Sequence, residues 1–392
     1  MAVPWKEQQL VEIRESFVRA FFSQRATMAE LCREYGIARK TGYKWTQRFI
    51  DGGVPNLVDR SRAAHHHPSA VSPDAVEALL ALRRRHPTWG PKKLEAVLQR
   101  EQPELEVPAR STISALLKRH GLVMEKQPRR RTPASSQPLA AATAPNVVWC
   151  TDFKGKFKVS RRYCHPLTIS DASSRFLIRC EPLEGERLEA SKRVFVDAFQ
   201  EYGMPLRMRS DNGTPFASTS IGGLSRLSVW WIKLGITPER IEPGHPEQNG
   251  RHERMHRTLK AAVASPPRSE WDEQKVALDA FRHEFNEVRP HEALAQRTPA
   301  SVYRASPRLY TGHDLDPEYP DHFDVRRTRK NGALYMGYAE VGLGVVLAEE
   351  CIGMEPVDDG CWHLWFGPIF LGRVRELGRG RFDFTKNQAA RR

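Results

Sequence analysis

The stretch Val147-Val148-Trp149-Cys150-Thr151-Asp152 is an apolar run that ends in a carboxylate. Such a run predicts a buried β-strand, and residues 205–210 predict a second strand that leads into Ser210-Asp211-Asn212-Gly213. A lone acidic residue at a strand end is usually part of a turn, and Asp-Asn-Gly has strong turn chemistry. Both residues, however, terminate apolar strands, as ligands placed at strand ends do.

A third carboxylate, Glu253, follows Pro246-Glu247-Gln248-Asn249-Gly250 at the start of a predicted helix. His256, Arg257 and Lys260 share its helical face, which is an arrangement that is normally just solvated. Glu247 competes as the third carboxylate, although an acidic residue in a first turn simply favours the helix dipole. Three acidic side chains brought to one point bind divalent metal, and two oxygen-ligated metal ions suit in-line attack at a phosphate.

The elements around these carboxylates predict a ribonuclease-H-like α/β domain over residues 146–305. Three consecutive strands come first, and alternating helices and strands follow. The strands are expected at 147–158, 162–170, 175–182, 205–210 and 237–241, and the helices at 187–202, at 223–234, from Pro246 onward and at 270–288.

Residues 1–52 predict a helix-turn-helix DNA-binding domain. Apolar residues repeat at helical spacing within 5–22, Thr27 caps a helix at 28–35, and a third helix is expected at 39–49. Polar and basic residues on the third helix suit a major groove, although an ordinary three-helix packing unit is the alternative. The predicted DNA contacts are Arg39, Lys40, Thr41, Tyr43, Lys44 and Arg48.

A second helix-turn-helix DNA-binding domain is predicted over residues 70–122. Ser72 caps its first helix, residues 92–100 form the next, and Arg110-Ser111-Thr112 cap a third at 113–120. Two such units in tandem indicate DNA binding more strongly than one. A basic linker, 123–145, lies along phosphates or is a solvated tether. The predicted DNA contacts in these two segments are Arg110, Ser111, Thr112 and Lys118, then Arg129, Arg130 and Arg131.

Residues 318–388 alternate apolar and polar residues over short runs, which predicts a small all-β barrel of about five to seven strands. No motif assigns this segment a function. Its strands are expected at 325–329, 333–336, 338–341, 345–347, 362–366, 369–374 and 381–384.

The formal charge of the chain is +14, and it is unevenly distributed. Residues 1–150 hold 24 Lys or Arg against 14 Asp or Glu, whereas residues 151–392 hold 37 against 33. A basic front half fits binding to a phosphate backbone, although a merely soluble basic surface has the same composition. The six cysteines form no Cys-x-x-Cys pair, which argues against structural zinc and a disulfide framework, and His65-His66-His67 is interpreted as a linker tract.

The sequence also bears on localisation. It has no N-terminal signal-peptide pattern and no apolar run near the length of a membrane span. We therefore expect a soluble bacterial protein of the cytoplasm, associated with the nucleoid and with no membrane partner.

With these motifs the chain resembles the DDE transposases, which are similar to retroviral integrases, and in particular the bacterial insertion-sequence-481 family. The resemblance covers about residues 1–305. It is carried by Trp149-Cys150-Thr151-Asp152-Phe153, by Ser210-Asp211-Asn212-Gly213 and by Pro246 to Glu253 with Lys260 beyond it. The family's usual tail is matched by Asn286, Arg289-Pro290-His291, Leu294 and Thr298-Pro299.

The resemblance implies an enzyme that binds the terminal inverted repeats of a mobile element, nicks the 3′ ends and transfers the strands into target DNA. It selects Glu253 over Glu247 and implies two Mg²⁺ ions, for which Mn²⁺ substitutes, held by Asp152, Asp211 and Glu253. It places Asn249, Arg257 and Lys260 against DNA. Because two DNA ends must be paired, a homodimer or a larger synaptic assembly is expected.

Two departures from the family pattern affect these expectations. Forty-one residues separate Asp211 from Glu253, more than in the usual integrase pattern, and the surplus is expected in a surface loop at 217–226. The zinc module of retroviral integrases is missing, and the two helical units replace it. A ribonuclease-H-like nuclease that only hydrolyses DNA and a catalytically inactive DNA-binding regulator are the alternatives.

Overall fold

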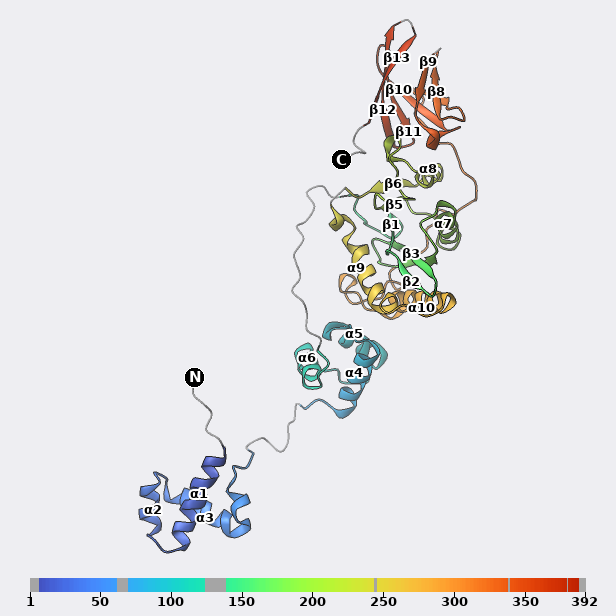
Figure 1. Ribbon diagram of the computed structural model, residues 1–392. Coiled ribbons are helices and arrows are strands. Elements are labelled where there is room, and N and C mark those ends of the chain that lie inside the picture. The colour runs from blue at the N-terminus through green and yellow to red at the C-terminus, as the bar shows by residue number, and fades with distance from the viewer. Residues whose placement is uncertain are drawn as a thin grey trace. The chain divides into compact units, whose positions relative to one another are not determined.

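The computed structural model describes residues 7–61, 70–123, 139–242, 245–337, 339–378 and 380–387. These residues form two compact units, 1–71 and 72–392, and Figure 1 shows the elements of each. None of the helices in the described ranges combines the length and the apolar character that crossing a membrane requires.

The first unit consists of three α-helices and a short 3-10 helix around one apolar core. Thr27 and Glu30 form a reciprocal cap at the second helix, in which each side chain bonds the other residue's main-chain N–H. The predicted helices and the Thr27 cap are therefore confirmed. Phe17, Leu31 and Leu57 are buried in the core. The elements are α1 (Glu7–Phe22), α2 (Met28–Glu34), α3 (Arg39–Gly52) and η1 (Val54–Leu57).

The second unit begins with three further helices, α4 (Pro73–Arg85), α5 (Pro91–Glu101) and α6 (Arg110–Arg119). Ser72 caps α4 as predicted, because its Oγ accepts the main-chain N–H of Ala75 at 3.2 Å. The predicted cap at α6 is wrong. That helix begins at Arg110 itself, and its flanking residue Ala109 makes no side-chain hydrogen bond, so residues 110–112 form its first turn.

A mixed six-stranded sheet lies at the centre of the next domain (Figure 1). Strand β1 pairs antiparallel with β3 and parallel with β5, and β6 extends the sheet beyond β5. The chain breaks the predicted first strand into β1 and β2, which pair with different parts of β3. The strands are β1 (Val148–Phe153), β2 (Phe157–Val159), β3 (Arg162–Asp171), β4 (Leu177–Leu183), β5 (Arg207–Ser210) and β6 (Thr237–Arg240).

Helices pack on this sheet through two apolar clusters. The helices α7 (Leu188–Tyr202) and α8 (Arg226–Lys233) bury Phe195, Phe199 and Trp231 against Trp149 of β1. The helices α9 (Gly250–Leu259) and α10 (Trp271–His283) bury a second cluster against Leu177 and Cys180 of β4. Short elements flank these helices: η3 (Pro246–Asn249), η4 (Lys260–Ala264), η5 (Glu284–Val288) and η6 (Glu292–Leu294).

The C-terminal segment forms an open five-stranded antiparallel sheet, β13-β12-β11-β10-β7, and a two-stranded sheet, β8-β9. A closed barrel stays a prediction, because in the described ranges no ladder joins β13 to β7. Two local predictions are wrong: residues 345–347 form a 3-10 helix, and the strand Cys351–Asp358 was not expected. The elements are β7 (Asp324–Arg327), β8 (Ala333–Met336), β9 (Ala339–Gly342), η7 (Val345–Leu347), β10 (Cys351–Asp358), β11 (Cys361–Phe366), β12 (Ile369–Gly378) and β13 (Arg381–Lys386).

The expected surface loop at 217–226 is also wrong, because most of it is buried. Its 3-10 helix η2 (Ile221–Gly223) and Leu224 join a single apolar cluster with the C-terminal strands. An added Cβ at Gly222 would meet Ile369 Cγ2 at 3.0 Å. This segment therefore anchors the C-terminal sheet to the central domain, since Ile221 and Leu224 are buried in a cluster with residues of that sheet.

We expect Leu224→Ala to lower the free energy of unfolding by about 2–5 kcal/mol, because it leaves a cavity at a residue that is 2% exposed. Leu206→Ala is the matched control, because Leu206 is 50% exposed and its truncation leaves no buried cavity. Urea denaturation of the full chain measures both. Equal, small effects would show that this segment behaves as a surface loop.

Candidate active site

The register of the central sheet brings two of the three predicted carboxylates to neighbouring positions. Strands β1 and β5 are parallel, and Thr151 pairs with Ser210. The next residue on each strand is Asp152 and Asp211, so the two acids lie side by side where the paired strands end. Asp152 is 21% exposed, and Asp211 is likewise partly buried.

Glu253 is presented to this edge by helix α9. The carboxylate lies in the first turn of the helix, where a negative charge favours the helix dipole. Its side chain is exposed, whereas Met255 and Leu259 anchor the helix in the apolar cluster beside β4. Glu253 acts on Asp152 electrostatically, which places the third carboxylate near the first.

Two histidines on the buried side of α9 contact the strands beneath Asp152. Thr168 Oγ1 on β3 lies 2.7 Å from His252 Nε2 and 2.6 Å from His256 Nε2, and it donates to the main-chain O of Asp152 at 2.9 Å. His252 Nδ1 lies 2.8 Å from Ser170 Oγ, and His256 Nδ1 lies 3.5 Å from Asp152 Oδ2. His256 and Glu253 were predicted to share one face of α9. In the structure Glu253 is exposed, whereas His256 is buried.

The Asp152 carboxyl is strongly perturbed. Its pKa is raised from 3.8 to about 7, first by burial and then by the charges of Asp211 and Glu253. The main-chain N–H of Phe153 and the cation of Lys154 oppose this shift but do not cancel it. Burial also lowers the pKa of His252 to about 3 and that of His256 to about 2, so these rings do not supply positive charge.

The pKa of Asp211 is raised as well. Burial raises its pKa, the N–H of Gly213 opposes the rise with a 3.1 Å hydrogen bond to Oδ1, and Glu186 adds to the rise. Two partly buried acids therefore lie at neighbouring positions, and the opposing groups do not offset the rise in either pKa. A divalent cation at this position would stabilise both ionised forms.

Asp152, Asp211 and Glu253 are near one another, but their side chains do not form a complete set of metal ligands. Across the described ranges, no group of three or more His, Cys, Asp or Glu side chains is arranged to hold a metal ion. The chemistry of the donors, which are carboxylate oxygens, fits Mg²⁺ or Mn²⁺. The geometry shows a pair of carboxylates with the third on an adjacent helix.

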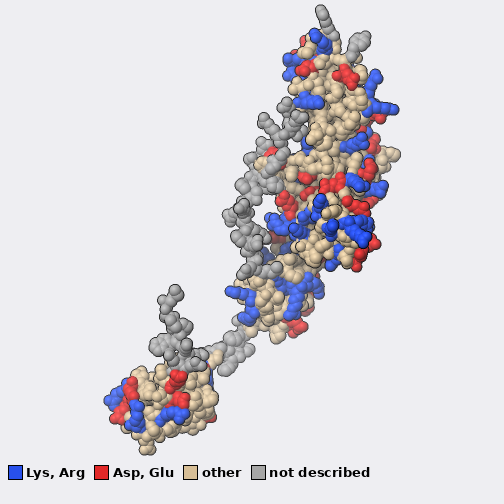
Figure 2. Space-filling model, in the orientation of Figure 1, with Lys and Arg blue, Asp and Glu red and all other residues tan. Residues whose placement is uncertain are grey.

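Most predicted DNA contacts of the helical units are exposed, and Figure 2 shows Lys and Arg side chains on the surface of both. Thr41 and Arg48 are half-buried, and Arg48 lies over the ring of Trp45 at 4.9 Å. Arg110 pairs with Glu95 at 2.5 Å, and Thr112 is half-buried. The exposed members of the set are Arg39, Lys40, Tyr43, Lys44, Arg110, Ser111 and Lys118.

The predicted contacts near the carboxylates divide into two kinds. Arg257 and Lys260 are exposed beyond Glu253 along α9 and η4. Asn249 is only 4% exposed, and its Oδ1 has no hydrogen-bond partner within the described residues. Arg129, Arg130 and Arg131 of the predicted linker lie outside the described residues, as does the tract at 65–67.

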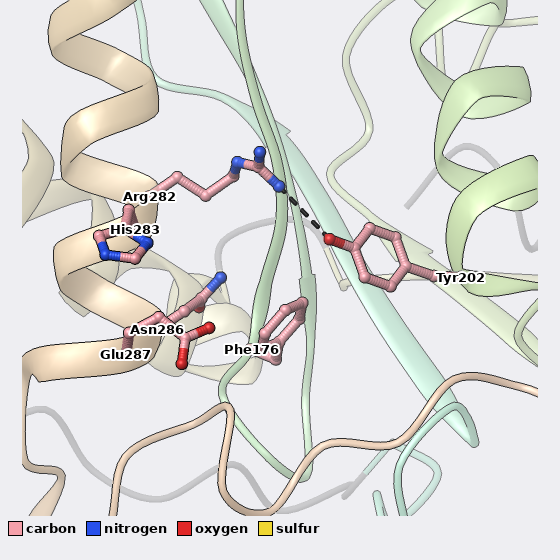
Figure 3. A pocket seen from close by; sticks show the side chains of 6 residues that line it. All are labelled: Phe176, Tyr202, Arg282, His283, Asn286 and Glu287. Atoms are coloured by element: carbon pink, nitrogen blue, oxygen red, sulfur yellow. Dashed lines mark hydrogen bonds between the residues drawn. The ribbon is translucent and has the colours of Figure 1, made fainter.

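A pocket of about 180 Å³ lies away from the carboxylates. It is lined by Phe176, Tyr202 and four residues of α10 and η5 (Figure 3). Asn286, which the family resemblance singled out, has a structural contact here: its amide exchanges two hydrogen bonds with the main chain of Leu177, at 2.8 and 2.9 Å. These two hydrogen bonds tie η5 to the start of β4.

Sequence reasoning missed the contacts of His252, His256, Thr168 and Ser170. The sequence does hold a signal for them, because His252 and His256 are four residues apart and bracket Glu253. A pair with this spacing lies on one helical face. Their partners on β3 become visible only with the sheet register.

Comparisons with known proteins agree with this architecture. Models of the integrase core domain match residues 142–246 and 234–299, and models of a helix-turn-helix domain and a homeodomain-like domain match 13–65 and 41–117. An uncharacterized 31.7 kDa protein of insertion element IS407 from Burkholderia multivorans is 26% identical over 263 residues, which are 64% of this chain and 90% of that protein.

Two viral proteins are more distant. The Gag-Pol polyprotein of baboon endogenous virus is 26% identical over 191 residues, which are 48% of this chain and 10% of the polyprotein. The HTLV-2 integrase catalytic core domain, solved in complex with magnesium, is 16% identical, with a TM-score of 0.30. That similarity covers 41% of this chain and 96% of the viral domain.

An integrase core that follows helix-turn-helix domains defines the class of DDE transposases and integrases. The integrase-core and helix-turn-helix matches support a transposase/integrase of this class, and the insertion-element protein is a relative to which the chain is similar. Its narrower placement in the insertion-sequence-481 family stays a prediction.

The raised pKa of Asp152 makes stability depend on pH in metal-free buffer. The folded protein keeps this proton up to about pH 7, whereas the unfolded chain releases it near 3.8. Folding stability therefore falls as the pH rises through this window and is level above it. We expect Asp152→Asn to gain stability over the wild type by a few kcal/mol between about pH 4.5 and 8. Urea denaturation with EDTA measures it, and parallel pH profiles of the two proteins would contradict the assignment.

Proposed function

We propose that Asp152, Asp211 and Glu253 hold two Mg²⁺ ions, for which Mn²⁺ substitutes, and that the protein nicks the 3′ ends of its element and transfers them to target DNA. The observation that carries this proposal is the β1–β5 register, which sets Asp152 beside Asp211. The raised pKa of both acids supports it, because such a site has more negative charge than the protein itself neutralises.

Bound divalent ions supply a Lewis acid for the nucleophile and for the leaving oxygen in phosphoryl transfer. The residues of the chain would hold these ions and position the DNA. Asp152 is the acid whose pKa the charges of both Asp211 and Glu253 raise, so it would be the central protein ligand of the ions. Lys154 provides positive charge next to Asp152, and Arg257 and Lys260 offer exposed cations for the phosphates of the DNA end.

The helical units are assigned to double-stranded DNA at the element ends. The exposed cations of α3 and α6 supply affinity through phosphates, and Tyr43 and neighbouring polar side chains reach base edges. Because two ends are joined to one target, the active form is a homodimer or a larger assembly.

The direct test combines the purified chain, Mg²⁺ and a labelled duplex that carries an inverted-repeat end from the DNA flanking the gene. We expect joined products with the wild type. Asp152→Ala should lower their yield by about 10³-fold or more, because a carboxylate that would hold the ions is lost. Asp197→Ala is the matched control and should leave the yield unchanged, since Asp197 is an exposed residue of α7 that is not among the acids assigned to the site.

The alternatives give different products in the same assay. Nicked but unjoined DNA would favour a nuclease that only hydrolyses. Specific binding with no cleavage by either the wild type or the Asp152 variant would favour a DNA-binding regulator.

The role of α3 is tested by salt dependence. Each phosphate contact contributes about one unit to the slope of log K against log salt. We expect Lys40→Ala with Lys44→Ala to weaken binding of the element end and to lower that slope by about two units. Arg19→Ala with Arg33→Ala removes the same charge from α1 and α2 and serves as the control. Equal slopes for the two double variants would exclude α3 as the DNA-contacting helix.

A further inference from the structure

Two buried histidines bracket Glu253 on α9, and the proposed function does not use them. We propose that His252 and His256, joined through Thr168 Oγ1, are positioning residues that fix helix α9, and with it Glu253, relative to the strand that carries Asp152. The inference rests on the proposed function for its effect on metal binding. It concerns how the third carboxylate is held, and it does not assign these histidines to the metal or to DNA.

The hydrogen-bond geometry around Thr168 allows one arrangement. The hydroxyl has a single proton, which it gives to the main-chain O of Asp152 at 2.9 Å. Its lone pairs then accept from both neighbouring rings, so His252 and His256 each donate through Nε2–H, at 2.7 and 2.6 Å. Ser170 Oγ donates to His252 Nδ1 at 2.8 Å, which completes the partners of that ring.

This network links three elements through one atom. Thr168 belongs to β3, its acceptor belongs to β1, and both of its donors belong to α9. Thr168 and Asp152 are also paired in the β1–β3 register. The acceptor is the main-chain carbonyl of the very residue whose side chain is the central carboxylate, so a shift of α9 acts directly on the position of Asp152.

The network lies at the end of α9 that carries Glu253. Met255 and Leu259 hold the helix by apolar packing, which is non-directional and tolerates sliding. Hydrogen bonds have narrow distance and angle limits, and His252 and His256 place them one residue before and three residues after Glu253. His252 and His256 are 2% and 6% exposed, with ring centroids 4.6 Å apart, so water does not replace these bonds.

The rival interpretation is that the two rings are ordinary buried polar groups whose partners only satisfy them. Both interpretations predict a loss of stability when the network is broken. They differ in metal affinity, because loss of a residue that orients a metal ligand typically weakens metal binding by about 10–100-fold. Metal affinity is therefore the measurement that separates them.

Thr168→Val and Thr168→Ser form a matched pair. Valine keeps the branched shape and removes the hydroxyl, whereas serine keeps the hydroxyl at the centre of the network. Thr258→Val makes the same change on α9 at a hydroxyl that bonds only the main-chain O of Arg254 within the helix, at 3.2 Å. All variants are prepared as the full chain, and circular dichroism and thermal melting confirm that they fold.

Mn²⁺ binding is measured by electron paramagnetic resonance, and hydrogen exchange is followed in peptides that cover 250–260. We expect Thr168→Val to weaken Mn²⁺ binding by about tenfold or more and to speed exchange in α9. Thr168→Ser and Thr258→Val should stay within about twofold of the wild type. Unchanged Mn²⁺ affinity in Thr168→Val overturns the proposal, and so does equal weakening by Thr258→Val.

Asp152→Ala separates a failure of this inference from a failure of the proposed function. If Asp152→Ala binds Mn²⁺ as the wild type does, the metal site is wrong and hydrogen exchange alone decides the positioning role. Faster exchange in Thr168→Val then supports it if it is confined to peptides covering 250–260 and reversed in Thr168→Ser. Equal exchange in the three proteins, or faster exchange throughout the chain, overturns it.

Discussion

The parallel hydrogen bonding of β1 to β5 is the constraint on which the rest of this site depends. Strand β1 is held on both edges, by β3 in antiparallel and by β5 in parallel register. Successive side chains on a strand point to opposite faces, so a slip of one residue would turn Asp152 to the other face of the sheet. Trp149, which is fully buried against α7, resists such a slip because it would leave the core.

The same constraint makes the metal-free site unfavourable. Two carboxyls are held partly buried beside each other, and their raised pKa values express the cost of ionising them there. A protein selected only for stability would replace one of these acids. Strain of this kind is expected where function requires charge that a ligand neutralises, so the electrostatic imbalance and the proposed metal site have one physical cause.

Features set by local sequence could be predicted, and features set by tertiary contact could not. The cap at Thr27 follows from a few neighbouring residues, and the acidic strand ends follow from apolar runs that stop at Asp152 and Asp211. The burial of Ile221 and Leu224 does not, because it depends on strands more than 100 residues away in the chain. A Ser- and Gly-rich composition suggested a loop there, and long-range packing overrode it.

The contacts of His252 and His256 show the same limit at the site itself. Their spacing places them on one side of α9, but only the pairing of β3 with β1 identifies Thr168 as their shared partner. The strand Cys351–Asp358 was missed for a related reason. Pro356 and Gly353 interrupt its pattern, whereas its pairing with β11 and β7 is what makes it a strand.

The central claim is that carboxylates from β1, from the end of β5 and from α9 meet around divalent metal. Anomalous diffraction from crystals of the full chain soaked in Mn²⁺ tests it most directly. The account predicts anomalous peaks within coordination distance of Asp152, with Asp211 and Glu253 as the other protein ligands. Peaks elsewhere, or none at Asp152 at a Mn²⁺ concentration that supports strand transfer, would contradict it.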